Sequence, residues 1–318
     1  MLDKPNDNND LWKIILKLKD ILPIEKKAFY LSFPINNLSD GINISEESQI
    51  ANPNKILISV NLNPNTGWAL NVNFSDNMAW PLFENSLLKE KQFLVIKRYL
   101  PYVLIRLNSY HKKTAQTIGH LAMSLDGKIA TNAGHSQWIG NKRNQIHSHR
   151  MRALADAILV GGNTFLKDKP QLNVRHVSGD DPIRIVMGNG DYKFDETANS
   201  EDIIWVKSEN GNDSNIDELI IGRTDKGFNC KTLLEELFKR NIYSVYIEGG
   251  GITLSGFIIS KSLDILQLHY APILMGSGIP CITLPEISEV GEAISFVDHQ
   301  MEKVEDEWMF TGVLNYDI

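Results

Sequence analysis

The sequence predicts a three-layer α/β domain with a mostly parallel central sheet, preceded by a small α+β unit. Two observations support this prediction. From about residue 116 onward, short apolar runs alternate with amphipathic, helix-like segments, and such alternation is typical of a parallel sheet with helices on both faces. Several of the apolar runs also end in polar or glycine-rich loops, which is where open α/β sheets build their ligand sites.

The composition narrows the class of protein. The 318 residues are 42% hydrophobic and carry a formal net charge of −7, which disfavours a nucleic-acid partner because such proteins usually present a basic face. No apolar run reaches membrane-spanning length, and the N-terminus is too polar for a signal peptide. The two cysteines, Cys230 and Cys281, form no metal-binding pair. We therefore expect a cytoplasmic protein with no metal, no membrane segment and no nucleic acid, and we expect it to form a homodimer.

The polar stretch at 110–114 is the best domain boundary, so the expected units are 1–112 and 113–318. In the first unit, helical spacing of apolar residues predicts a helix over 11–22, and the Asn-, Ser- and Gly-rich stretch 35–54 is expected to be a loop. Four strands are predicted at 55–62, 68–74, 93–96 and 102–107.

In the second unit, the pattern predicts a strand, a turn, a strand and a basic, His-rich helix over 142–152, in which His147 and His149 are expected to be solvated. Further strands are expected at 157–162, 182–187, 203–206, 243–247 and 266–274, with helices at 231–240 and 252–262. The runs 294–297 and 309–314 are expected to close the sheet as an antiparallel pair.

Two loops of this unit stand out. Asp126-Gly127 separates two apolar runs, and this dipeptide favours a tight turn because Gly tolerates positive φ. Glu248-Gly-Gly-Gly251 follows a predicted strand and opens a predicted helix. Its backbone N–H groups could cradle a pyrophosphate, or the glycines could simply form a tight strand-to-helix turn, and spacing alone does not separate these alternatives. The loop is neither the dinucleotide fingerprint nor a P-loop.

From Gln116 to the C-terminus the chain resembles the pyrimidine reductase of riboflavin biosynthesis. The resemblance is carried, in the family's order, by Ser124-Leu-Asp-Gly-Lys128, Ser136-Gln-Trp-Ile139, Arg152-Ala153, Ile158-Leu-Val-Gly161, Thr164 with Asp168, Leu172 with Arg175, and Ile247-Glu-Gly-Gly250. It implies a dihydrofolate-reductase-like fold. It also implies reduction, with NADPH, of the ribosyl side chain of a phosphorylated ribosylamino-pyrimidine.

The resemblance also implies site residues. Cofactor contacts are expected from Ala122, Trp138, Thr164, Asp168, Asn189, Gly250, Gly251, Ile252, Thr253, Leu254, Ser255 and Gly256. Substrate contacts are expected from Ser136, Arg152, Leu172, Arg175 and Glu248.

Asp168 and Glu248 are the expected catalytic residues. By residue type alone, Asp168 is an exposed turn residue, but an acid beside the reacting carbon could supply the proton that accompanies hydride addition. Glu248 either binds a polar substrate or caps the following helix. Arg152 and Arg175 would be surface residues by default, although forked guanidinium groups suit a phosphate-bearing substrate.

The chain departs from the family at two places. His120 stands where many members carry Lys, and because His titrates near neutrality the substrate or the pH optimum could differ. Met187-Gly188 stands where the family usually has Asp, so the resemblance predicts less firmly which residues hold the cofactor's ribose. The alternatives are therefore a reductase of a related pyrimidine or pteridine, or a non-catalytic nucleotide-binding sensor.

Bifunctional members of this family carry a zinc deaminase ahead of the reductase. Residues 1–110 contain no Cys and no His, so the ligands of such a zinc site are missing. We expect the first unit to be a packing or dimerisation module instead.

Overall fold

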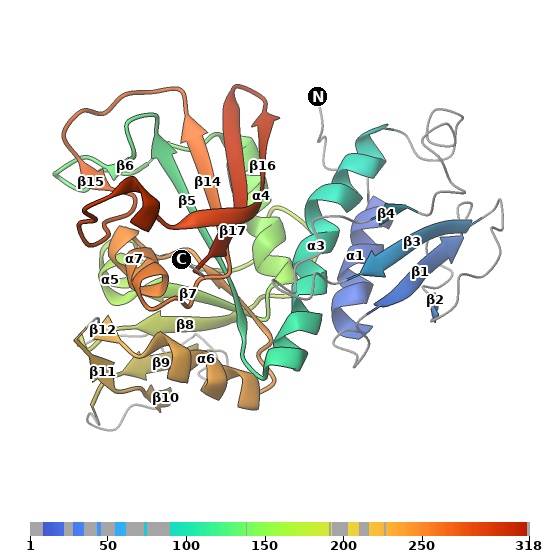
Figure 1. The fold of residues 1–318 in the computed structure, drawn as a ribbon, viewed down its shortest axis with the longest axis horizontal. Coiled ribbons are helices and arrows are strands. Elements are labelled where there is room, and N and C mark those ends of the chain that lie inside the picture. Colours follow the sequence, from blue (N-terminus) through green and yellow to red (C-terminus); the bar gives the residue numbers. More distant parts are fainter. Residues whose placement is uncertain are drawn as a thin grey trace. The chain divides into compact units, whose positions relative to one another are not determined.

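A computed structural model describes residues 9–21, 28–34, 43–45, 55–61, 73–74, 90–137, 139–190, 192, 203–209, 216–225 and 227–316 (Figure 1). The chain divides into two compact units, Met1–Lys113 and Thr114–Ile318. Within the described residues, no helix combines the length and the apolar character needed to cross a membrane.

Among its described residues, the smaller unit contains the helices α1 (Asn9–Ile21) and α3 (Glu90–Lys112) and a sheet of order β2-β1-β3-β4. Trp12 of α1 packs edge-on against Tyr99 of α3, with ring centroids 5.6 Å apart. The predicted helix at 11–22 and the strand at 55–62 are confirmed. The strands are β1 (Ala28–Pro34), β2 (Asn43–Ser45), β3 (Lys55–Asn61) and β4 (Asn73–Phe74), and β1 pairs antiparallel with β2 and β3.

Three predictions for this unit are wrong. The runs 93–96 and 102–107 are not strands, because both belong to α3, which continues through Pro101. The buried residues Val95, Tyr99, Val103 and Leu107 recur at helical spacing, and the residues between Tyr99 and Ser109 are buried as well, so a helix that is buried all round explains the apolar runs. The stretch 35–54 also contains β2, and most of the strand predicted at 68–74 lies outside the described residues.

The larger unit is built on a sheet of order β10-β9-β8-β7-β13-β5-β14-β17-β16 among the described residues. From β10 to β14 every neighbouring pair is parallel, whereas β17 and β16 run antiparallel. The predicted mostly parallel sheet and its closing antiparallel pair are therefore confirmed. The strands are β5 (Gln116–Ser124), β7 (Ala157–Gly161), β8 (Ile183–Met187), β9 (Ile203–Lys207), β10 (Asp217–Ile220), β13 (Ser244–Ile247), β14 (Ile265–Ala271), β16 (Ser295–Val304) and β17 (Glu307–Asn315).

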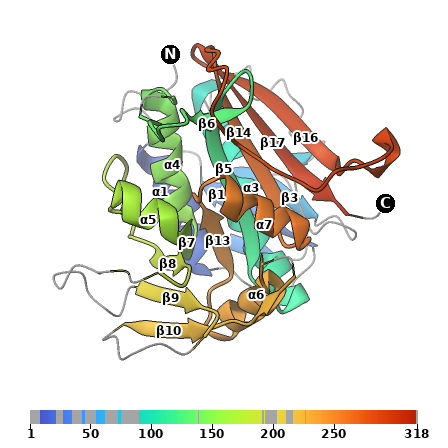
Figure 2. The same cartoon turned by 90° about the vertical axis from the view of Figure 1, so that its left-hand side faces the viewer.

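Helices cover this sheet on both faces, as predicted (Figure 2). The helix α6 (Cys230–Lys239) buries Leu233, Leu234 and Leu237 in an apolar core that also takes in Leu254 and Phe257 of α7 (Gly251–Ile259). The helix α4 (Lys142–Leu154) lies on the opposite face. The remaining elements are α5 (Gly162–Asp168), the pairs β6 (Lys128–Ala130) with β15 (Ile279–Pro280) and β11 (Arg223–Thr224) with β12 (Gly227–Phe228), and the 3₁₀ turn η2 (Val290–Glu292).

The expected Asp-Gly turn lies between β5 and β6, with Gly127 at φ +77° and its N–H donating to the Ser124 carbonyl over 3.0 Å. Asp126 accepts hydrogen bonds from the Ser124 hydroxyl (2.5 Å) and from the N–H groups of Met275 (3.0 Å) and Gly276 (2.6 Å). These bonds lower the pKa of Asp126 to about 2. The turn thus ties the end of β5 to the loop that follows β14.

Candidate active site

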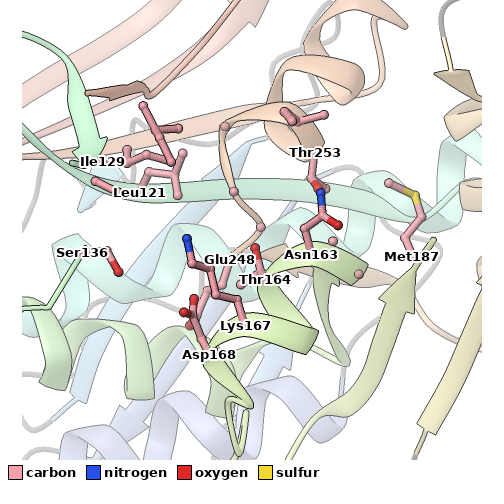
Figure 3. Close-up of a pocket in the computed structure, with 18 of the residues that line it drawn as sticks. Leu121, Ile129, Ser136, Asn163, Thr164, Lys167, Asp168, Met187, Glu248 and Thr253 are labelled. Carbon is pink, nitrogen blue, oxygen red and sulfur yellow. The ribbon is translucent and has the colours of Figure 1, made fainter. Parts of the chain in front are cut away.

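A cavity of about 1570 Å³ opens at the carboxyl ends of the parallel strands (Figure 3). Ala122 of β5, Gly161 of β7, Met187 of β8 and Glu248 after β13 all line it. Parallel strands end at the same edge of a sheet, so residues distant in sequence meet there. Every lining residue belongs to the larger unit.

One end of the cavity is lined by glycine backbone. Gly249, Gly250 and Gly251 follow β13, and a Cβ atom on Gly251 would lie 2.5 Å from the Pro280 carbonyl oxygen. Gly250 is the N-cap of α7, so no side chain satisfies the first N–H groups of that helix. Because uncapped N–H groups and the helix dipole favour anions, this end fits the phosphates of a dinucleotide such as NADPH.

The structure brings most of the expected cofactor residues to this cavity. Those that line it are Ala122, Thr164, Asp168, Asn189, Gly250, Gly251, Ile252, Thr253 and Gly256. The amide of Asn189 is already bonded to Ser208, donating to its hydroxyl (2.6 Å) and accepting from its N–H (2.9 Å). Its side chain therefore joins the ends of β8 and β9.

Two expected cofactor residues are placed differently. The Leu254 side chain is fully buried in the core, and the Ser255 hydroxyl accepts a hydrogen bond from the Thr283 N–H over 2.9 Å. Neither residue lines the cavity, because the helical turn carries these side chains away from it. Trp138 lies outside the described residues.

The other end of the cavity is charged. Arg152 of α4 forms a two-pronged ion pair with Glu248, with Nε–Oε1 at 2.8 Å and Nη2–Oε2 at 2.6 Å. Burial alone would lower the pKa of Arg152, but the Glu248 carboxylate reverses the effect and raises it. Arg152 Nη1 also donates to the Asn173 carbonyl over 3.0 Å. Two residues predicted to contact substrate thus contact each other.

The remaining residues expected at this end are Ser136, Asp168, Leu172 and Arg175. Ser136, Asp168 and Arg175 line the cavity and are exposed. Arg175 Nη1 donates to Gln171 Oε1 (3.2 Å) and to Asn173 Oδ1 (2.8 Å). Leu172 does not line the cavity: it is 2% exposed, with φ at +56°, and it anchors the loop that carries Arg175.

Lys167 is a charged residue of the cavity that sequence reasoning missed. Its ammonium crosses to Gly134, where a Cβ atom would lie 1.6 Å from Nζ, and Figure 3 shows it beside Ser136 and Asp168. Its position directly before Asp168, a predicted site residue, could have indicated that Lys167 also lies in the site. His149, Tyr192 and Arg223 also line the cavity without having been predicted there, and no local motif marks them.

The expectation that His147 and His149 are solvated is wrong, because α4 packs its histidines inward. His147 is 4% exposed and lies 3.3 Å from Gln267 through Nε2 and Oε1. His120 is buried beside it, with ring centroids 5.6 Å apart. Burial, and then the nearby His269, lower the pKa of His120 well below 6.5, so His120 does not titrate near neutrality as expected. Among the described residues, no group of His, Cys, Asp or Glu has the geometry to hold a metal ion.

The family described as the RibD C-terminal domain matches residues 116–309. The riboflavin biosynthesis protein RibD of Aquifex aeolicus is 34% identical over 203 residues, which cover 60% of this chain and 52% of that protein. The chloroplastic riboflavin biosynthesis protein PYRR of Arabidopsis thaliana is 28% identical over 204 residues, covering 61% of this chain and 34% of that protein.

Among solved structures, the diaminohydroxyphosphoribosylaminopyrimidine deaminase/5-amino-6-(5-phosphoribosylamino)uracil reductase of Thermotoga maritima superposes with a TM-score of 0.56 at 26% identity, covering 69% of this chain and 61% of that chain. The chain spans about half the length of the Aquifex aeolicus relative. The family match extends over more than half of this chain and takes in every residue that lines the cavity, so the chain belongs to the RibD C-terminal domain family.

Proposed function

We propose that the chain is an NADPH-dependent reductase of riboflavin biosynthesis. It would convert the ribosyl side chain of a phosphorylated ribosylamino-pyrimidine, such as 5-amino-6-(5-phosphoribosylamino)uracil, which the name of the Thermotoga maritima protein includes, to the ribityl form. The single observation that carries the proposal is that one cavity joins a glycine-lined helix N-terminus to a cluster of cations and carboxylates. A dinucleotide phosphate fits the first end, and a phosphorylated polar substrate fits the second.

Bound NADPH would supply the hydride. The chain's contribution is to hold donor and acceptor in reacting geometry. Gly250 and Gly251 allow close approach to the phosphates, and Thr164 lies beside them, since a Cβ atom on Gly250 would be 3.3 Å from its hydroxyl oxygen. Ala122 near the end of β5 and Asp168 at the end of α5 line the cavity and would flank the nicotinamide.

The charged end would bind the substrate. Arg175 is the exposed guanidinium and Lys167 the exposed ammonium of this end, so we assign the phosphate to them. Arg152 is engaged by Glu248 and by the Asn173 carbonyl, so its main role would be to hold the Glu248 carboxylate toward the substrate. Ser136 would add a hydroxyl contact on the opposite wall.

Reduction of the ring-opened imine adds a hydride to the sugar's first carbon and a proton to the neighbouring nitrogen. Asp168 is an exposed carboxyl group in this part of the cavity, so it could take a proton from water and pass it to that nitrogen. Glu248 would orient the substrate.

The test is NADPH oxidation by the purified chain with the phosphorylated ribosylamino-pyrimidine, its dephosphorylated form and a panel of pterins. We expect turnover with the phosphorylated pyrimidine and a product heavier by two hydrogens. If only a pterin is turned over, the substrate is a pteridine and not the phosphorylated pyrimidine. NADPH binding without turnover on any substrate would instead leave a nucleotide-binding sensor.

The first 112 residues would serve packing or self-association, since every residue that lines the cavity lies beyond them. The fragment 113–318 should therefore keep NADPH affinity. If that fragment stays folded but loses all turnover, the accessory role is wrong.

We place the protein in the cytoplasm, as a homodimer, with its two buried cysteines as free thiols. The exposed apolar side chains of Met301 and Trp308 on β16 and β17 offer a dimer surface. Trp308→Asp should lower the mass in solution, and an unchanged mass would remove this surface from consideration.

A further inference from the structure

The loop that carries Arg175 has no regular secondary structure over residues 169–176. Something must fix its backbone if Arg175 is to project into the cavity in one orientation. Leu172 provides one anchor, since it is buried, and Asp181 provides another by accepting the Val174 N–H over 2.6 Å. Neither anchor contacts Arg175 itself.

Helix α4 contacts the loop with two side chains that are one helical turn apart. His149 Nδ1 accepts the backbone N–H of Arg175 over 3.2 Å. Arg152 Nη1 donates to the Asn173 carbonyl over 3.0 Å. In one bond the helix side chain accepts from a backbone N–H, and in the other it donates to a backbone carbonyl. Helix α4 therefore holds the loop at two backbone groups that are two residues apart.

The His149 ring is buried and neutral, so it can accept this hydrogen bond. It is 3% exposed, and its ring packs edge-on against His176 with centroids 4.4 Å apart. Burial first, and then the charges of Arg152, His176 and Arg175, lower its pKa to about 3. The imidazole is therefore neutral, and because Nδ1 accepts a hydrogen bond, the ring proton resides on Nε2.

We propose that His149 is a positioning residue that fixes the backbone of Arg175 and thereby sets the affinity of the cavity for the substrate's phosphate. The inference rests on the proposed function, which assigns the substrate's phosphate to Arg175. His149 lines the cavity, and it acts through Arg175.

The experiment uses the full chain and two probes. Ribose 5-phosphate is titrated by calorimetry, and KM and kcat are measured with the phosphorylated pyrimidine. His149→Gln should raise both the Kd for ribose 5-phosphate and the KM for the phosphorylated pyrimidine by about tenfold. This is the effect expected for loss of a hydrogen bond that orients a charged group. His149→Asn should restore most of the affinity, because its side-chain oxygen can occupy the position of Nδ1. NADPH affinity should stay unchanged in both variants.

A double-mutant comparison separates positioning from general stability. In an Arg175→Ala background, His149→Gln should cause no further loss of ribose 5-phosphate affinity, because the two residues act as one unit. Equal affinities of His149→Gln, His149→Asn and the unchanged chain for ribose 5-phosphate would overturn the proposal, and so would additive losses. If the pyrimidine is not reduced but the pattern of phosphate binding holds, the proposed function fails and the positioning role stands.

Discussion

Arg152 and Glu248 are 96 residues apart in sequence, yet their side chains form a parallel pair of charge-assisted hydrogen bonds at 2.8 and 2.6 Å. Their side chains are only 12% and 15% exposed, so water screens the pair weakly. The pair joins α4 to the end of β13 and sets the orientation of the carboxylate in the cavity. A guanidinium predicted to bind phosphate is thus committed mainly to a carboxylate.

Arg152→Ala should therefore lower the free energy of unfolding by about 3 kcal/mol, because it leaves Glu248 buried without its partner. Arg152→Lys should recover only part of the loss, since an ammonium cannot form the two-pronged contact. Urea denaturation of both variants measures the effect.

The matched control is the double variant Arg152→Ala with Glu248→Ala, which should lose less stability than the sum of the single variants. Strict additivity would mean that the two residues do not stabilise each other in solution.

Gly250→Val should raise the Kd for NADPH by about tenfold or more, equal to roughly 1.4 kcal/mol, while the fold persists. An added Cβ atom would meet only Thr164 Oγ1, at 3.3 Å, so the side chain would intrude on the cavity rather than on the core. Calorimetric titration with NADPH gives the Kd.

Gly251→Ala should instead lower the stability of the fold. Its Cβ atom would lie 2.5 and 2.6 Å from two backbone oxygens, which is too close for the backbone to stay in place. Gly291→Val, where a Cβ atom meets nothing, should leave both properties unchanged. NADPH affinity that is unaltered by Gly250→Val would reduce the glycine loop to a turn.

The buried histidines should make the protein sensitive to acid. His120 and His149 have pKa values in the folded protein below 6.5, so the unfolded chain binds more protons once the pH falls below 6.5. Stability is then complete above that pH and declines as the pH falls, by up to about 1.4 kcal/mol per pH unit for each histidine. Urea denaturation at about pH 5 and at about pH 7.5 should show this decline.

His120→Gln should make the decline in stability below pH 6.5 less steep, because Gln does not titrate. The control is His135→Gln, at an exposed position, which should leave the decline unchanged. An identical pH dependence in His120→Gln and in the unchanged chain would show that His120 does not contribute.

The fold of the larger unit could be predicted because its signals are local. Buried parallel strands such as 157–161 form short apolar runs between polar loops, and the Asp126-Gly127 turn needs only its own residues. The strands predicted at 93–96 and 102–107 are wrong because Pro101 interrupts a helical repeat of apolar residues and leaves two short runs that look like strands. In that helix, packing outweighs the local effect of proline.

The charged end of the site could be predicted only in part. The family resemblance implied that Arg152, Arg175 and Glu248 share one site, and all three line one cavity. Which of them pair was not predictable, because partners on α4 and after β13 are set by tertiary packing. The burial of His149 was missed for the same reason, since a basic helix conceals which of its polar residues face inward.

The assignment of the substrate's phosphate to Arg175 and Lys167 gives the most decisive prediction. Arg175→Ala should raise KM for the phosphorylated substrate by about tenfold or more, since a charge-assisted hydrogen bond contributes roughly 1.5–3 kcal/mol. Lys167→Ala should act in the same direction, and Arg175→Lys should recover part of the loss. NADPH affinity should change little, because these residues lie at the other end of the cavity.

The comparison that isolates the phosphate is KM for the phosphorylated against the dephosphorylated substrate. The unchanged chain should prefer the phosphorylated form, and Arg175→Ala should lose most of that preference by raising only one of the two KM values. Exposed lysines Lys142 and Lys231 do not line the cavity, so their alanine variants test whether any lost positive charge weakens binding. If the unchanged chain does not distinguish the two substrates, Arg175 does not bind a phosphate, and the reductase must recognise its substrate through the ring and the sugar hydroxyls alone.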